Sequence, residues 1–250
     1  MKKLFFLVLV ISSNFIIAQT TNKLFENANT LYKEAKYTEA IKLYEKIETS
    51  NQVSADLYFN LGNCYYKLNK VAPTIYYYEK ALKLQPLHRA AANNLVFAKR
   101  LTLDVIEELP KTFLQKLDEN YVKKLSYNQW AIVVVVLSFI ASILFLLFYF
   151  AESSSRKRLY FVISILSFLL FFVSIGITFN QFKWSEKNVK AIVFSEKTSI
   201  QNAPTLNSDA VFTLHEGTKV TVLDAVDNWK KIKLTDGKTG WILSDELKEI

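Results

Sequence analysis

The chain has 250 residues, 51% of them hydrophobic and 14% aromatic, and its formal net charge is +8. The hydrophobic share indicates membrane segments, and half of the positive excess flanks apolar runs instead of marking one basic face, so nucleic acid is not an expected partner. One cysteine, Cys64, excludes an internal disulfide framework, and the two histidines, His88 and His215, lie in different segments, so we expect no metal site and no cofactor.

The first eighteen residues have the pattern of a secretory signal peptide. Lys2 and Lys3 form a positive start, residues 4–17 are mostly apolar, and Ala18 precedes a cleavage point. An uncleaved anchor is the alternative. Either one predicts that the chain that follows is exported.

Residues 21–100 contain a repeat with a period of 34 residues, in copies at 21–54 and 55–88 and a partial third from 89. The positions that recur are Ala28, Tyr37, Ala40, Tyr44 and Ile47, matched by Gly62, Val71, Thr74, Tyr78 and Ala81. The spacing of Gly62, Tyr65, Ala81 and Pro86 resembles a tetratricopeptide repeat, which implies two packed helices in each copy.

This resemblance implies a concave face, made by the first helix of each repeat, that binds peptides. Asn29 and Asn60 match the asparagines with which some family members grip a peptide backbone. The cationic positions of their carboxylate clamp are held here by Phe25, Ala90 and Asn94, so capture of a C-terminal carboxylate is not expected. Extended-peptide binding is the hypothesis, and a plain surface role is the alternative for each residue. The candidate groove residues are Phe25, Asn29, Tyr32, Lys33, Asp56, Phe59, Asn60, Asn63, Tyr66 and Lys67.

Residues 101–129 form a helical linker between the repeats and the apolar half of the chain. Phe113, Leu117, Tyr121 and Leu125 recur every four residues with charges between them, which predicts an amphipathic helix. Such a helix can pack on the repeats, or it can lie on a membrane surface just before the first span. The sequence leaves both alternatives open.

Two runs of 21 residues, 130–150 and 159–179, contain no charge and are long enough to cross a membrane. The segment between them, 151–158, is too short for a domain, so the runs predict a helical hairpin. The absence of charges inside the runs argues against a transporter or channel.

The connecting loop carries Arg156, Lys157 and Arg158. Cytoplasmic loops are enriched in such residues, so we expect this loop in the cytoplasm and the large segments on both sides of the hairpin outside it. The export signal predicts the same orientation independently.

Residues 189–250 change to the alternating pattern of β-strands at 219–223, 229–234 and 240–242, and Asp236 with Gly237 predicts a hairpin turn. The series that ends in Gly240-Trp241-Ile242 resembles a bacterial SH3 domain, which implies an all-β barrel that binds peptidoglycan or peptides. Trp229 and Trp241 are the candidate ligand platforms, with a place in a small core as the alternative.

The expected fold is therefore multidomain: an all-α tetratricopeptide repeat domain, a two-helix transmembrane hairpin and an all-β SH3-like barrel. No phosphate loop, nucleophile elbow or metal cluster is present, so we do not expect an enzyme.

The order of these parts resembles the BatE family of the Bacteroides aerotolerance (Bat) operons. The resemblance implies an envelope scaffold in the bacterial inner membrane, with both domains in the periplasm and with proteins, among them von Willebrand-type Bat proteins, as partners. A peptidoglycan-binding or wall-sensing protein that acts through the SH3-like domain is the alternative.

Overall fold

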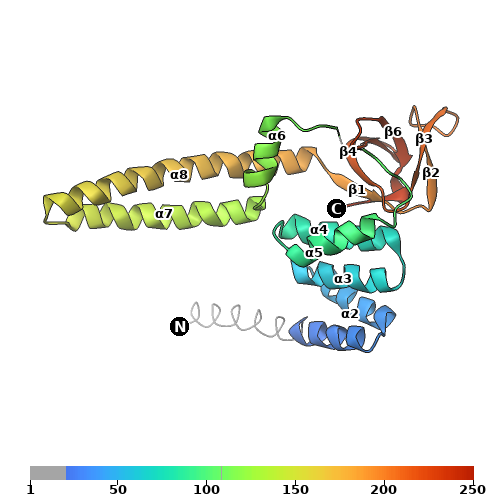
Figure 1. The fold of residues 1–250 in the computed structure, drawn as a ribbon, viewed down its shortest axis with the longest axis horizontal. Helices are drawn as coiled ribbons and strands as arrows, with labels where there is room; N and C mark the ends of the chain where they lie inside the picture. The colour runs from blue at the N-terminus through green and yellow to red at the C-terminus, as the bar shows by residue number, and fades with distance from the viewer. Residues whose placement is uncertain (1–20, 108) are drawn as a thin grey trace, which may run out of the picture. The chain divides into compact units, whose positions relative to one another are not determined.

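A computed structural model of the chain describes residues 21–107 and 109–250. The predicted signal peptide, 1–18, lies outside the described residues. The chain forms two compact units (Figure 1). We call the first, Met1–Glu108 with Lys190–Ile250, the composite unit, and the second, Leu109–Val189, the hairpin unit.

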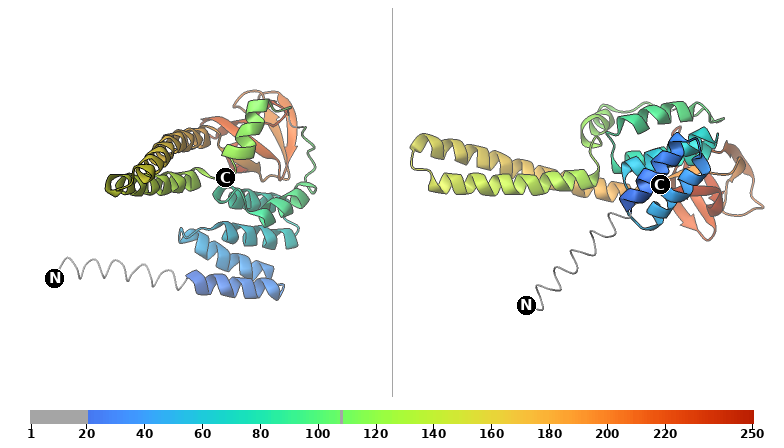
Figure 2. Two further views of the ribbon diagram at one scale, coloured as in Figure 1. Left: turned by 60° about the vertical axis from the view of Figure 1, so that its left-hand side comes forward. Right: turned by 90° about the horizontal axis from the view of Figure 1, so that it is seen from below.

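The repeat region of the composite unit is a stack of helices (Figures 1 and 2). Residues 21–33 are helical, and the helices that follow are α2 (Tyr37–Thr49), α3 (Ala55–Lys67), α4 (Val71–Leu84) and α5 (Arg89–Lys99). The local sequence explains where α3 and α5 begin, because the side chains of Ser54 and His88 each accept a hydrogen bond from the backbone N–H three residues later. Helices therefore follow one another through the whole predicted repeat region up to Lys99.

Aromatic and small side chains form the core of the repeats. Tyr44, Leu57 and Leu61 are buried in one cluster with the alanines of both copies. Gly62 lies directly against the ring of Tyr78, since a Cβ at Gly62 would stand 2.5 Å from that ring. The small residue predicted for helix contact therefore does bring α3 and α4 close together.

The C-terminal part of the composite unit is a β domain with seven strands, all paired antiparallel in the order β3-β2-β6-β5-β4-β1-β7. Gly237 turns between β5 and β6 with a φ of 96°, as the Asp-Gly signal predicts. Side chains such as Ile200, Ile232 and Ile242 fill its core. The strands are β1 (Lys190–Val193), β2 (Lys197–Gln201), β3 (Ala210–His215), β4 (Lys219–Val226), β5 (Trp229–Lys233), β6 (Thr239–Leu243) and β7 (Leu247–Glu249).

The β domain packs against the last helices of the repeats, which the sequence did not predict. Ile192 of β1 is fully buried in a cluster with Ile75 of α4 and with Leu95 and Ala98 of α5. Phe194 adds an edge-on ring contact at 5.6 Å with Tyr76. The β domain thus covers apolar surface that a further repeat would cover in a longer array.

Charged side chains join the same two parts. Glu79 of α4 is 8% exposed, and one carboxylate oxygen accepts a hydrogen bond of 2.6 Å from Lys219 of β4. Lys99 of α5 forms an ion pair at 3.5 Å with the other oxygen. Burial alone would raise the pKa of Glu79, but Lys219 and Lys99 outweigh it and hold the pKa below its ordinary value.

The segment after α5 runs along the β domain and is held by Asp104. Its carboxylate accepts the backbone N–H of His215 at 2.7 Å and the hydroxyl of Thr218 at 2.5 Å. In addition, the carboxylate of Glu216 accepts the N–H of Ala72 in the first turn of α4. The contacts therefore come from three places along the interface.

The hairpin unit contains α6 (Phe113–Leu117), a π-helix (Asp118–Val122), α7 (Tyr127–Phe150) and α8 (Ser154–Lys187). Helices α7 and α8 are long and apolar enough to cross a membrane, and most of their large apolar side chains are exposed. With the repeats and the antiparallel β domain, these two helices confirm the expected fold class.

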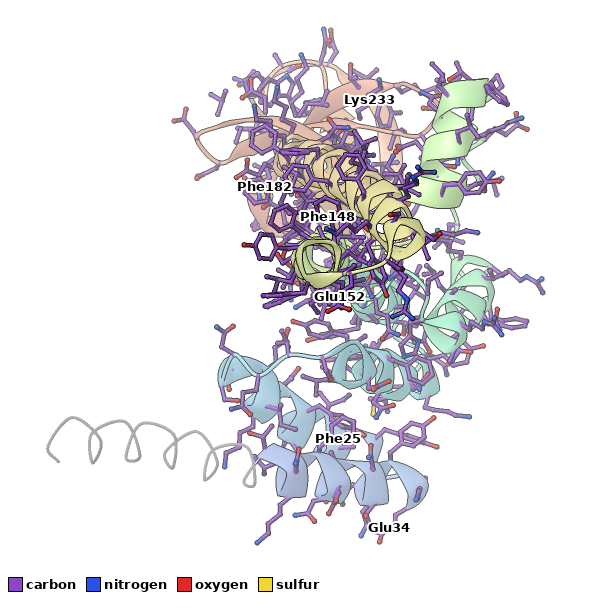
Figure 3. All side chains as sticks on the ribbon, turned by 90° about the vertical axis from the view of Figure 1, so that its left-hand side faces the viewer. Phe25, Glu34, Phe148, Glu152, Phe182 and Lys233 are labelled. Carbon is purple, nitrogen blue, oxygen red and sulfur yellow. The ribbon has the colours of Figure 1, made fainter. Side chains whose placement is uncertain are left out.

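Both long helices extend beyond the predicted spans of 130–150 and 159–179. Ser153 caps α8 by accepting the N–H of Arg156, so the basic residues expected in the loop lie in the first turns of α8. The turn itself is short and holds Glu152, labelled in Figure 3.

Candidate functional site

The first helices of the repeats carry a ladder of asparagine side chains. The Oδ1 atom of Asn29 accepts hydrogen bonds from the hydroxyl of Tyr44 at 2.5 Å and from the amide of Asn60 at 3.0 Å. One period later, the Oδ1 atom of Asn63 accepts from the hydroxyl of Tyr78 at 2.7 Å and from Asn94 at 2.9 Å. The same arrangement therefore occurs twice, 34 residues apart. We call Asn29, Asn60, Asn63 and Asn94, with Tyr44 and Tyr78, the asparagine ladder.

The ladder holds its amides in fixed positions and leaves part of their bonding capacity for a ligand. Asn60 donates one N–H to Asn29, whereas Asn94 donates to Asn63 and, at 3.4 Å, to the hydroxyl of Tyr78. Each amide has a carbonyl oxygen besides, and Asn60 has a second N–H. Those groups match the donors and acceptors of an extended peptide backbone. Tyr44 and Tyr78, whose hydroxyls donate to Asn29 and Asn63, belong to the buried core.

A pocket of about 260 Å³ lies at the part of the asparagine ladder that contains Asn63, Asn94 and Tyr78. Tyr66 and Phe97 are 38% and 53% exposed there, so their rings offer apolar surface to a ligand. Lys67 adds a positive charge at the same place. The lining residues are Tyr32, Asn63, Tyr66, Lys67, Tyr78, Asn94 and Phe97.

The hydroxyls of Tyr32 and Tyr78 in this pocket stay protonated near neutral pH. Burial raises the pKa of Tyr78 to about 12, and burial also raises the pKa of Tyr32. Both hydroxyls therefore remain hydrogen-bond donors. The nearby thiol of Cys64 is buried, which raises its pKa to about 12, so a reactive thiolate is not present at neutral pH.

The remaining groove candidates lie in different surroundings. Phe25, labelled in Figure 3, contacts the ring of Tyr44 at 5.7 Å, and Phe59 contacts the ring of His88 at 5.1 Å, so both phenylalanines pack within the repeat. Lys33 is exposed, and so is Asp56, whose carboxylate lies 3.1 Å from His88.

Asn94 and Phe97 of α5 were not among the sequence candidates, although they line the pocket. Asn94 had been noted only as a departure from the carboxylate clamp. The signal that could have found it is the period itself, since Asn60 and Asn94 are one repeat apart, as are Asn29 and Asn63.

The two tryptophans of the β domain differ in exposure. Trp229 is 9% exposed and belongs to the interior of the domain, while Trp241 is half-buried, with the ammonium of Lys231 at 5.9 Å from its ring. Of the two predicted platforms, Trp241 is the one that a ligand can reach. Within residues 21–107 and 109–250, no three His, Cys, Asp or Glu side chains gather as metal ligands would.

Comparison with known families finds two matches. Residues 55–87 match the tetratricopeptide repeat, and residues 200–248 match the bacterial SH3 domain. No curated protein is similar enough to the chain to count as a match. The chain therefore carries two kinds of binding module, in the segments where their helices and strands lie.

Proposed function

We propose that this protein is a scaffold of the bacterial envelope, anchored in the inner membrane by α7 and α8, which binds partner proteins through the groove of its tetratricopeptide repeats. The observation that carries the proposal is the asparagine ladder with its adjoining pocket. It presents amide groups, exposed aromatic rings and a lysine on one face of the repeats. These groups suit a peptide in extended conformation.

The anchoring is supported by the exposure of the long helices. An apolar helix that is not covered by protein needs a hydrocarbon environment, and α7 and α8 have the length to cross one. The composite unit is built from the chain before and after the hairpin. A chain that crosses a membrane twice returns to its starting side, as that unit requires.

The order of parts supports a role like that of the BatE family, in aerotolerance or envelope stress. In that role the partners are other Bat proteins of the same membrane, including those of von Willebrand type, and both large segments are periplasmic. No residue of the chain is assigned a catalytic task, and the groove and the β domain act by binding alone.

The groove is tested by replacing residues that face the pocket without supporting the core. We choose Tyr66→Ala, Asn94→Ala and Phe97→Ala together. Asn63 keeps its bond to Tyr78 in this variant, so the repeats still fold. Loss of a hydrogen bond and of aromatic contacts amounts to roughly 3 kcal/mol, or on the order of 100-fold in affinity.

The measurement is co-purification of partner proteins with the full chain from detergent extracts of native membranes, and circular dichroism checks the fold. Lys42→Ala on α2 is the matched control, because Lys42 is exposed outside the pocket. Recovery of all partners by the folded triple variant, with loss of all of them after Trp241→Ala, would assign binding to the β domain.

A second candidate function is peptidoglycan binding by the β domain. It is favoured by the bacterial SH3 match and by the accessible ring of Trp241. The test is sedimentation of the full chain in detergent with purified sacculi. Binding that is lost on Trp241→Ala and kept in the triple groove variant supports this candidate, and no binding by the unaltered chain removes it.

A further inference from the structure

A short helical segment precedes the first long helix and leaves its apolar side chains exposed. It consists of α6 and the π-helix that follows, residues 113–122, and we call it the lead-in segment. Phe113 and Leu114 are each 74% exposed, and Tyr121 is 69% exposed. Adjacent apolar side chains in such numbers mark a surface that something else covers.

The apolar side chains of the lead-in segment share one face. Phe113, Leu117 and Tyr121 are four residues apart, so they follow one stripe of the helix. The residues between them are polar except Leu114, which is three residues before Leu117 and so adjoins the same stripe. The ion pair at 2.9 Å between Lys111 and Glu119 joins residues outside that stripe. The segment is therefore amphipathic.

Two hydrogen bonds fasten the end of the lead-in segment to both long helices. The carbonyl oxygen of Val122 accepts the indole N–H of Trp130 in α7 at 2.9 Å and the side-chain amide of Gln181 in α8 at 2.7 Å. Trp130 begins the uncharged run of α7, and Gln181 follows the uncharged run of α8. The segment is thus held where both helices change from apolar to polar.

Cations and aromatic rings gather at the same place. The ammonium of Lys123 lies 4.2 Å from the ring centroid of Trp184, and that of Lys183 lies 4.5 Å from the ring of Phe179. Tryptophan and lysine side chains of this kind are enriched where a membrane meets water, with the ring at the headgroup level and the cation reaching outward.

We propose that the lead-in segment lies flat in the phospholipid headgroup region of the leaflet that α7 enters, with Phe113, Leu114, Leu117 and Tyr121 directed into the acyl boundary. This inference depends on the membrane anchoring proposed above. The covering surface is the bilayer, because the segment is fastened to the very ends of the apolar runs, where lipid headgroups surround the helices.

The test uses the full chain reconstituted into vesicles of phosphatidylethanolamine and phosphatidylglycerol, with Cys64 replaced by Ala. Single cysteines are introduced by Leu117→Cys in the apolar stripe and, as its matched control at a polar position outside the stripe, Lys116→Cys, and each carries a spin label. A third label at Leu146→Cys reports the hairpin. Collisions with oxygen, which is concentrated in lipid, are compared with collisions with a water-soluble nickel chelate.

The proposal predicts a ratio of oxygen to nickel collisions that is several-fold higher at residue 117 than at residue 116. Equal, water-like ratios at both positions overturn it, and so does protection of residue 117 from both reagents, which indicates a protein partner. The label at residue 146 separates this failure from a failure of the anchoring, since only a spanning hairpin gives a lipid-like ratio there.

Discussion

Gly62 of α3 lies against Tyr78 of α4 in the second repeat. The ring of Tyr78 fills the space that a side chain at residue 62 would need, because a Cβ added there would stand 2.5 Å from the ring. Gly62→Leu should therefore force the ring aside and destabilise the chain by about 1–3 kcal/mol. Thermal unfolding followed by circular dichroism measures the effect.

Gly176 provides the matched control, because no atom lies within 4 Å of the Cβ that it would carry. Gly176→Leu should leave the melting temperature unchanged or raise it, since leucine favours a helix over glycine. Equal losses in both variants would mean that the loss at Gly62 does not come from the contact with Tyr78.

Glu79 makes the stability of the composite unit depend on pH. Its pKa is lower in the folded chain than its ordinary value of 4.5, so the unfolded chain binds the proton more readily. The stabilising contribution is complete above pH 4.5 and disappears as pH falls through the lowered folded value. Glu79→Gln should remove this part of the acid dependence.

Urea unfolding at a series of pH values, read by tryptophan fluorescence, checks this expectation. Asp104 contributes in the same direction, because hydrogen bonds from Thr218 and His215 overcome its burial and lower its pKa. An unchanged acid slope in Glu79→Gln would assign the whole effect to other carboxylates, with Asp104 the first to replace.

Single residues were predicted from the sequence where the repeat period defines their neighbours. Gly62 and Tyr78 occupy the repeat positions that Ala28 and Tyr44 hold in the first copy. Asn29 and Asn60 were chosen from the resemblance to the tetratricopeptide repeat. What the sequence did not show is that the side-chain oxygen of Asn29 accepts the hydroxyl of Tyr44, a residue of the buried core. Removing Asn29 would orphan that hydroxyl, so Asn94 is the better residue to change.

At the scale of elements, the periodic patterns of the sequence predicted which strands and helices form, but they did not predict where the long helices end. The strands β4, β5 and β6 lie at 219–226, 229–233 and 239–243, close to the predicted 219–223, 229–234 and 240–242. The long helices extend past the apolar runs because a helix continues wherever its backbone hydrogen bonds remain favourable, and charge marks the edge of a lipid-facing stretch without ending the helix.

The orientation of the hairpin yields a prediction about its tip. With Arg156, Lys157 and Arg158 in the first turns of α8, a cysteine at Ser154 should be cytoplasmic. Ser154→Cys, with Cys64 replaced by Ala, should resist a membrane-impermeant thiol reagent in intact spheroplasts. Asn207→Cys, exposed in the β domain, should react readily. A reactive cysteine at residue 154 with a protected one at residue 207 would show the opposite orientation.

The composite unit forms from segments that are far apart in the chain, and no local sequence pattern predicts that they pack together. Glu79 and Lys219 are 140 residues apart in sequence, and Ala72 and Glu216 are 144 apart. Pairing over such distances leaves no periodic trace in a single sequence, whereas repeats and strands do. The packing of the β domain on the repeats could therefore not be predicted from the sequence.

A double-mutant cycle tests that packing. Glu79→Gln and Lys219→Met should show a coupling energy of about 1–3 kcal/mol, because the half-buried ammonium of Lys219 pairs with the buried carboxylate of Glu79. The control cycle uses Lys230 and Glu249, a more exposed pair within the β domain, where roughly 0–1 kcal/mol is expected. Zero coupling in the first cycle would mean that this ion pair does not stabilise the packing of the two domains.

The shared core of the composite unit also sets an order of events during synthesis. The repeats leave the ribosome first, and the surface of Ile75, Leu95 and Ala98 stays uncovered until β1 supplies Ile192. That strand is made only after α7 and α8. In the proposed anchoring, a chain in which only one of the two helices crosses the membrane has its two halves on opposite sides, and this surface stays open to proteases. Completion of the composite core therefore requires that β1 reach the side of the membrane on which the repeats lie.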